Sequence, residues 1–268
     1  IQHQLALLPG TEVASRESRA TFGLKGAFRP IQRCVGRYSF LEEDFTAVDV
    51  EEISVSTTEL TFEDYLEARR LYLTVGLFYN DRIFAEIHHL LRLLGLSTWE
   101  WLEMIHNVIP DSPEEVRAIY DGFIRETQGE LWEEEEDLKK DVARGIDRYT
   151  KGEVGDNLIY KYRVTGLVTC FDRLHEIAFR TLGSYLKSKA FDCPEVVRDI
   201  EEFSRLQRGR LLDFAFQGEE IFRYDIPRLG RLAAVKSGQL EDFRYEKPTR
   251  IRFAHTPEQE KMIRSKLD

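Results

Sequence analysis

The stretch TFEDYLEARRLYLTVGLFYNDRIFAEIHHLLRLLG, residues 61–95, decides how this chain folds. Apolar residues recur in it every three or four positions along two neighbouring stripes, which is the spacing of an amphipathic helix. Thr61, with Asp64 three residues later, predicts the helix start, and Gly95 predicts its end. The pattern predicts one long helix, or two helices joined at Asn80-Asp81. Because two of its faces are apolar, we expect this segment to be the spine against which shorter helices pack.

A second long helix is predicted from Asp156 to about Lys189, lying against the first. The fold class that follows is mainly α: a helical domain, residues 58–209, built around two long antiparallel helices. Residues 1–57 are predicted to be an N-terminal arm that opens with a strand over residues 1–7. Its part from residue 25 to residue 49 has glycine, proline and scattered aromatic residues, which indicates an irregular path.

Residues 210–268 are predicted to form a small β-strand region with a terminal helix. Two strands are expected at residues 211–216 and 221–227, around a turn at Gly218, and a third at residues 250–254. Asp225 is a polar residue between large apolar ones, and we expect it to cap or pair locally.

Composition excludes several classes of function. The chain has 268 residues, 42% hydrophobic and 32% charged, with a formal net charge of −10. This charge argues against nucleic acid or an anionic membrane as the main partner, although a local basic patch is compatible with it. Apolar runs do not approach the ~20 residues of a membrane span. Three cysteines far apart in sequence, Cys34, Cys170 and Cys193, fit a reducing compartment, so we expect a cytoplasmic protein.

The chain begins at Ile1 without a methionine, inside a strand-like run. We therefore expect it to be a piece of a longer protein, with residues 1–57 as the remnant of another domain.

Several segments occur in an order that resembles a known family. They are LALLPGTE (5–12), the ESR and FGLK elements of residues 17–25, ELTFEDYLEARRLYLTVGLFYND (59–81), FRYDIP (222–227) and RFAHTPEQEKMI (252–263). Together they resemble the region that follows the catalytic core in radical S-adenosylmethionine (radical SAM) proteins of the cobalamin-binding class. The resemblance implies that residues 1–57 come from a partial barrel and that the rest is a largely helical C-terminal region.

The resemblance also indicates which residues would lie near the active site of the parent enzyme. It places Leu8, Pro9, Gly10 and Thr11 near the active site of the parent enzyme. The family's cluster motif, three cysteines spaced C-x3-C-x2-C, does not occur in this sequence, so no catalytic or cluster-binding residue is carried over. S-adenosylmethionine, a 4Fe-4S cluster and cobalamin are accordingly expected in the parent enzyme and not in this chain.

An alternative comes from the histidines. Glu86/His89 and Glu103/His106 are Glu-x-x-His pairs on helices that are neighbours in sequence, and such pairs supply ligands in di-iron carboxylate bundles. Asp172/His175 repeats the spacing. With 48 acids and six histidines in the chain, however, roughly one such pair is expected by chance, and surface contacts use the same spacing.

The sequence thus predicts an accessory C-terminal region of a radical SAM enzyme, which covers the active site or docks a substrate or subunit and is not catalytic alone. Its partner would be the rest of its own parent chain. The alternatives are a helical di-metal carboxylate oxidoreductase and a helical protein-interaction module whose exposed aromatic residues bind a protein partner. A severed barrel edge at residues 1–8 could also pair two copies into a homodimer.

Overall fold

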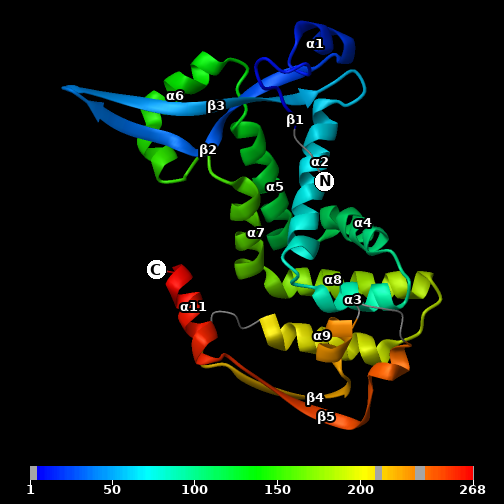
Figure 1. Ribbon diagram of the computed structural model, residues 1–268. Coiled ribbons are helices and arrows are strands. Elements are labelled where there is room, and N and C mark those ends of the chain that lie inside the picture. Colours follow the sequence, from blue (N-terminus) through cyan, green and yellow to red (C-terminus); the bar gives the residue numbers. More distant parts are fainter. Residues whose placement is uncertain (1–4, 209–212, 233–238, 268) are drawn as a thin grey trace. The chain divides into compact units, whose positions relative to one another are not determined.

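The computed structural model describes residues 5–208, 213–232 and 239–267 (Figure 1). Within these ranges the chain is mainly helical, with an N-terminal strand region and a two-stranded sheet near the C-terminus, as predicted. It divides into two compact units. Unit 1 comprises Ile1–Leu73 and Arg117–Thr165, and unit 2 comprises Thr74–Val116 and Gly166–Asp268. The division into residues 1–57, 58–209 and 210–268 stays a prediction.

Unit 1 contains a three-stranded antiparallel sheet in the order β1-β3-β2. Its strands are β1 (Leu5–Ala6), β2 (Lys25–Phe40) and β3 (Glu43–Ser56). The prediction of an irregular path over residues 25–49 is therefore wrong, because β2 and β3 form a long hairpin there (Figure 1). Pro30 and Gly36 interrupt the strand pattern in the sequence. A register shift between Pro30 and Val35, with Arg33 at a φ of 62°, absorbs the irregularity as a bulge within one strand pair.

The helices with residues in unit 1 are α1 (Arg16–Phe22), α2 (Phe62–Val75), α5 (Glu114–Gly129), α6 (Glu135–Thr150) and α7 (Leu158–Thr169). Helix α6 lies against the β2–β3 hairpin in Figure 1. Its buried residues Leu138, Val142 and Ile146 pack on partly buried side chains of the hairpin and its surroundings: Phe28, Val35, Val48, Val50, Trp132 and Tyr149. This apolar layer holds the hairpin to α6.

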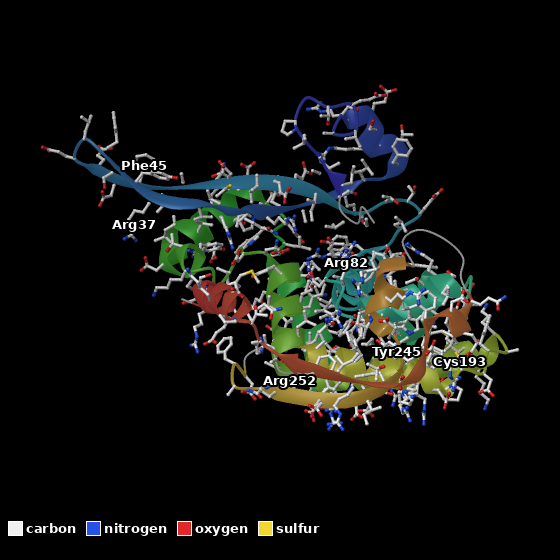
Figure 2. The ribbon with its side chains drawn as sticks, turned by 60° about the horizontal axis from the view of Figure 1, so that its bottom comes forward. Arg37, Phe45, Arg82, Cys193, Tyr245 and Arg252 are labelled. Carbon is white, nitrogen blue, oxygen red and sulfur yellow. The ribbon has the colours of Figure 1, made fainter. Side chains whose placement is uncertain are left out.

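The closed end of the hairpin carries exposed apolar side chains. Tyr38 and Phe45 are paired across the strands, and their rings stack with centroids 5.7 Å apart. Phe40 and Leu41 are 69% and 88% exposed. Figure 2 shows Phe45 near this end, with Arg37 further along β2.

The helical elements with residues only in unit 2 are α3 (Ala85–Leu93), α4 (Thr98–Val108), α8 (Phe171–Ser188), α9 (Pro194–Arg208), α10 (Ile226–Leu232), α11 (Pro257–Leu267), a π-helical turn (Gly76–Asn80) and short 3₁₀ turns at Ile109–Asp111 and Leu240–Phe243. Its strands are β4 (Gln217–Tyr224) and β5 (Arg244–Ala254), which pair antiparallel. Rings of Phe203, Phe222 and Phe253 meet between α9 and this sheet, with centroids 5.3–6.0 Å apart.

The two long antiparallel helices are not confirmed, because each segment is interrupted. The first is interrupted after the π-helical turn, which ends at Asn80, and Arg82 has a φ of 56°, which an α-helix cannot continue. The alternative of two helices joined at Asn80-Asp81 is therefore the one that the structure shows for this segment. The second is split at Cys170, whose φ of −128° and ψ of 18° separate α7 from α8. The predicted ends of the first segment are confirmed. Thr61 and Asp64 exchange backbone and side-chain hydrogen bonds of 2.8 and 3.2 Å, and Gly95, with a φ of 67°, follows α3.

The strands of the C-terminal part differ from those predicted. Residues 211–212 lie outside the described ranges, and residues 213–216 form a turn closed by a 3.0 Å bond from the amide of Phe216 to the carbonyl of Asp213. The partner of β4 is β5 instead, which includes the predicted third strand at residues 250–254. Asp225 ends β4 and begins α10, since its carboxylate accepts from the amide of Arg228 at 3.0 Å. Its predicted role as a local cap is confirmed.

Candidate functional site

Residues Leu8, Pro9, Gly10 and Thr11 form a tight turn after β1. The amide and the hydroxyl of Thr11 both donate to the carbonyl of Leu8, at 3.2 and 2.7 Å. Pro9 occupies the first central position, and Gly10, with a φ of 84°, supplies the left-handed backbone that the second requires. All four residues are exposed. The structure thus explains them as a turn, and their closeness to a parent active site stays a prediction.

The four proposed metal ligands make separate contacts. Glu86 is buried, and its two oxygens accept from Arg208 at 2.9 Å each. Nδ1 of His106 lies 3.0 Å from a threonine hydroxyl, whereas Glu103 is exposed and Nδ1 of His89 is buried with no hydrogen-bond partner. Over the described ranges, no three His, Cys, Asp or Glu side chains gather into a group that could hold a metal ion.

Other reactive side chains of unit 2 lie in environments that keep them neutral. Burial lowers the pKa of His88 and of His175 to about 4. His175 is surrounded by aromatic rings, with that of Phe179 at 4.5 Å. Burial, followed by the charge of Asp192, raises the pKa of Cys193, whose position is labelled in Figure 2. A neutral thiol and weakly basic imidazoles support packing better than acid–base or nucleophilic catalysis near pH 7.

A group of buried charges in unit 1 is centred on Arg29. Arg29 of β2 lies directly opposite Glu51 of β3, and its Nε donates to Glu51 at 2.7 Å. Its Nη1 donates to Glu130 at 3.3 Å. Glu130 directly follows α5, and reciprocal backbone bonds of 2.7 and 2.8 Å between Phe28 and Trp132 fix this segment to β2. The sheet register and this bridge therefore bring two carboxylates to one guanidinium.

A second buried guanidinium lies beside this group. Arg69 of α2 is 3% exposed, and its guanidinium carbon stands 4.9 Å from the centre of the Phe123 ring. Arg29, Arg69 and Glu130 all line a cavity of about 290 Å³. The other residues that line it are Gln32, Tyr72, Asn157, Leu158, Ile159, Tyr160 and Arg163. We refer to it as the basic cavity, because its described lining contains three arginines and one acid.

The basic cavity also receives the beginning of α7. The side-chain oxygen of Asn157 accepts from the amide of Tyr160 at 3.0 Å and so caps this helix. Because the N-terminus of a helix carries a partial positive charge, α7 adds to the positive potential of the three arginines. The arrangement is suited to a small anion, such as a carboxylate or a phosphate group.

The pKa shifts in the group reflect burial and close charges. Burial raises the pKa of Glu130, while Arg29 and Arg69 act to lower it. Burial would lower the pKa of Arg29, but Glu130 and Glu51 together raise it above its ordinary value. Burial lowers the pKa of Arg69, and the like charge of Arg29 acts in the same direction. Two guanidiniums are thus held close together in a poorly hydrated place, which a bound anion would stabilise.

None of the residues of this site was predicted from the sequence as a functional residue. Arg69 could have been noticed, because it lies four residues after Tyr65 and four before Leu73, on the buried face of the first predicted helix. A charged residue on such a face needs a partner. The partners could not be inferred, since Arg29 and Glu130 are separated by 101 positions in the sequence.

Comparisons with known proteins do not identify the chain. No family model matches it, and no curated protein matches it. None of the helices in the described part of the chain is both long enough and apolar enough to span a membrane.

Proposed function

We propose that this chain is an accessory region that docks an anionic substrate for a larger enzyme and does not perform the reaction itself. The observation that carries the proposal is the basic cavity of unit 1, where Arg29, Arg69 and Arg163 line a space at the N-terminus of α7. Its volume of about 290 Å³ is suited to a small molecule or to one end of a larger one.

The enzyme that it would serve is, in this proposal, a radical SAM enzyme of the cobalamin-binding class. The ordered segments from residue 5 to residue 263 support this choice. The remainder of that enzyme would be the partner of this chain, and it would hold the S-adenosylmethionine, the 4Fe-4S cluster and the cobalamin. The reading frame upstream of Ile1 tests the assignment: a C-x3-C-x2-C motif about 200 residues earlier would support it, and a frame without the motif would contradict it.

Binding of inorganic phosphate and of acetate to the chain tests the docking site. We expect saturable binding by isothermal titration calorimetry at low ionic strength, and a rise in the midpoint of thermal unfolding as the anion is added. Arg163→Gln should weaken binding by about tenfold, because it removes a charge-assisted contact. Arg163 is preferable to Arg29 or Arg69 for this test, since the latter two are buried within the fold.

Arg37→Gln is the matched control. Arg37 is an arginine of the same unit whose side chain is 57% exposed on the hairpin, and it does not line the cavity. We expect this variant to bind both anions as the unaltered chain does. Absence of saturable binding, or equal losses in the two variants, would contradict the docking site.

A further inference from the structure

A second cavity of unit 1 adjoins the basic cavity. It has a volume of about 480 Å³, and its lining shares Glu130 and Leu158 with that of the basic cavity. One wall comes from α6 and the loop after it, including Asp141, Tyr149 and Glu153. The two cavities are therefore neighbouring spaces that share the side chains of Glu130 and Leu158.

The formal charges of the two linings are opposite. The described lining of the second cavity contains the acids Glu126, Glu130, Asp141 and Glu153 against the two arginines Arg125 and Arg148, so we refer to it as the acidic cavity. Glu126 and Glu130 are engaged by Lys161 and Arg29, at 2.7 and 3.3 Å, which leaves Asp141 and Glu153 as the acids for a ligand. Trp132 and Tyr149 add aromatic surface. Carboxylates combined with aromatic faces are the surroundings that proteins use to hold organic cations. A ligand with a single charge would satisfy only one of the two spaces.

The acidic wall is built to keep its shape. Burial, followed by a hydrogen bond to Asp141, raises the pKa of Tyr149 to about 12, so the phenol stays protonated and donates to Asp141 at 2.9 Å. Gly155, with a φ of 71°, lies against the rings of Pro30 and Tyr149, and a Cβ there would stand 3.0 and 3.1 Å from their nearest atoms. The glycine lets the loop after α6 approach β2 closely and close the cavity.

Resting on the proposed function, we propose that the docked molecule is a zwitterion that occupies both cavities. Its anionic group, a carboxylate or phosphate, lies among the arginines of the basic cavity. Its cationic group, an ammonium, lies in the acidic cavity beside Asp141 and the Tyr149 ring. The chain between the two groups passes Glu130 and Leu158, the residues that the two linings share.

A series of ω-aminoalkanoates of four to eight carbons, compared with alkanoates of the same lengths, tests the proposal. The two series differ only in the cationic end. By calorimetry with the full chain, we expect the best ω-aminoalkanoate to bind about tenfold more tightly than its matching alkanoate, the gain of one good charge-assisted contact. Affinity should peak at one length, because the ligand must reach from one cavity to the other.

Two variants assign the ends of the ligand. Asp141→Asn combined with Glu153→Gln should remove most of the gain of the zwitterion while leaving the alkanoate affinity within about twofold. Arg163→Gln should weaken both series. Thermal unfolding of each variant in the absence of ligand shows whether the fold is retained.

The outcomes separate this inference from the function on which it rests. Equal affinities for the two series, with Arg163→Gln still weakening both, would overturn the zwitterion and leave the anion site standing. Failure of phosphate, acetate and both series to bind would overturn the proposed function as well.

Discussion

In each unit an arginine forms an ion pair with a buried carboxylate, but the two arrangements differ. In unit 2, Arg208 meets Glu86 through two parallel hydrogen bonds of 2.9 Å, and each carboxylate oxygen has its own donor. In unit 1, the guanidinium of Arg29 is shared between Glu51 and Glu130. Its neighbour Arg69 adds a second buried positive charge, and a cavity opens beside them.

The Arg208–Glu86 pair supports packing, whereas the group around Arg29 can also bind an anion. A bidentate pair satisfies both partners and presents little charge to anything else. In the group around Arg29 the charges of Arg29 and Arg69 are balanced by Glu51 and Glu130, but Arg163 and the start of α7 add positive potential, and the cavity gives a ligand access to it. Burial of charge alone is therefore a weak sign of function, and the geometry of the pairing is the better one.

The largest effect should come from Arg29→Met. This substitution leaves Glu51 and Glu130 near each other and without their common partner, and breaking a buried pair in this way costs roughly 3–5 kcal/mol of the free energy of unfolding. Urea titration followed by circular dichroism measures the loss. Arg37→Met is the matched control, because Arg37 and Asp147 lie 3.7 Å apart with side chains 57% and 77% exposed. An exposed pair of this kind contributes roughly 0–1 kcal/mol.

A loss in Arg29→Met no greater than that in Arg37→Met would contradict the buried character of the group around Arg29. It would mean that the two carboxylates reach water in the variant and that the group is not held in a buried place.

The next effect concerns pH. As the pH changes, the contributions of His175 in unit 2 and of Glu130 in unit 1 to stability should change in opposite directions. His175 of unit 2 has its pKa lowered to about 4 by burial. Between its unfolded value of about 6.5 and about 4, the unfolded state binds one more proton than the folded state, so stability falls as the pH falls, by about 1.4 kcal/mol per pH unit. Glu130 of unit 1 has a raised pKa, so its contribution falls instead as the pH rises through the interval between its unfolded and folded values.

His175→Leu isolates the part due to unit 2. Urea titrations from pH 7.5 to pH 4.5 should give a shallower loss of stability in acid for this variant than for the unaltered chain. His88, whose pKa is also lowered to about 4 by burial, should keep part of the slope in the variant. Identical slopes in the two proteins would show that the imidazole of His175 is not kept neutral by the fold.

Helix caps and helix ends could be predicted from the sequence, because they depend on residues that are close together in the chain. The reciprocal bonds of Thr61 and Asp64, the left-handed Gly95 and the cap at Asp225 each involve a few positions, and their chemistry is readable from residue type. Interruptions within a long apolar pattern were harder to predict from the sequence. The apolar spacing of the second segment runs on past Cys170, so nothing in it indicates the break between α7 and α8, whereas a junction at Asn80-Asp81 was one of the two alternatives predicted for the first segment.

The candidate site was hidden for a related reason. Glu51 is opposite Arg29 only because of the hairpin register, which is set by a bulge at residues where the sequence indicated an irregular path. Glu130 comes from the far end of α5, and its position depends on the bridge between Phe28 and Trp132. Long-range pairing of this kind leaves no pattern in a single sequence. The predicted Glu-x-x-His pairs had a pattern, yet the structure places Glu86 with Arg208.

The smallest net change in the free energy of unfolding is expected when both members of the Glu86–Arg208 pair are replaced. Glu86→Leu alone should cost about 3–5 kcal/mol, because Arg208 would be left half-buried without its carboxylate. Glu86→Leu with Arg208→Met should recover most of that loss and end within about 1 kcal/mol of the unaltered chain, since apolar groups of similar size can replace an isolated buried pair.

The same double replacement in unit 1, Arg29→Met with Glu130→Leu, should not recover the loss. Glu51 and Arg69 would remain without the charges that now balance them, and the coupling extends beyond two residues. Urea titrations of the four single variants and the two double variants measure both recoveries. Equal recovery in the two units would mean that Arg29 and Glu130 are also an isolated pair, with no coupling to Glu51, to Arg69 or to the basic cavity.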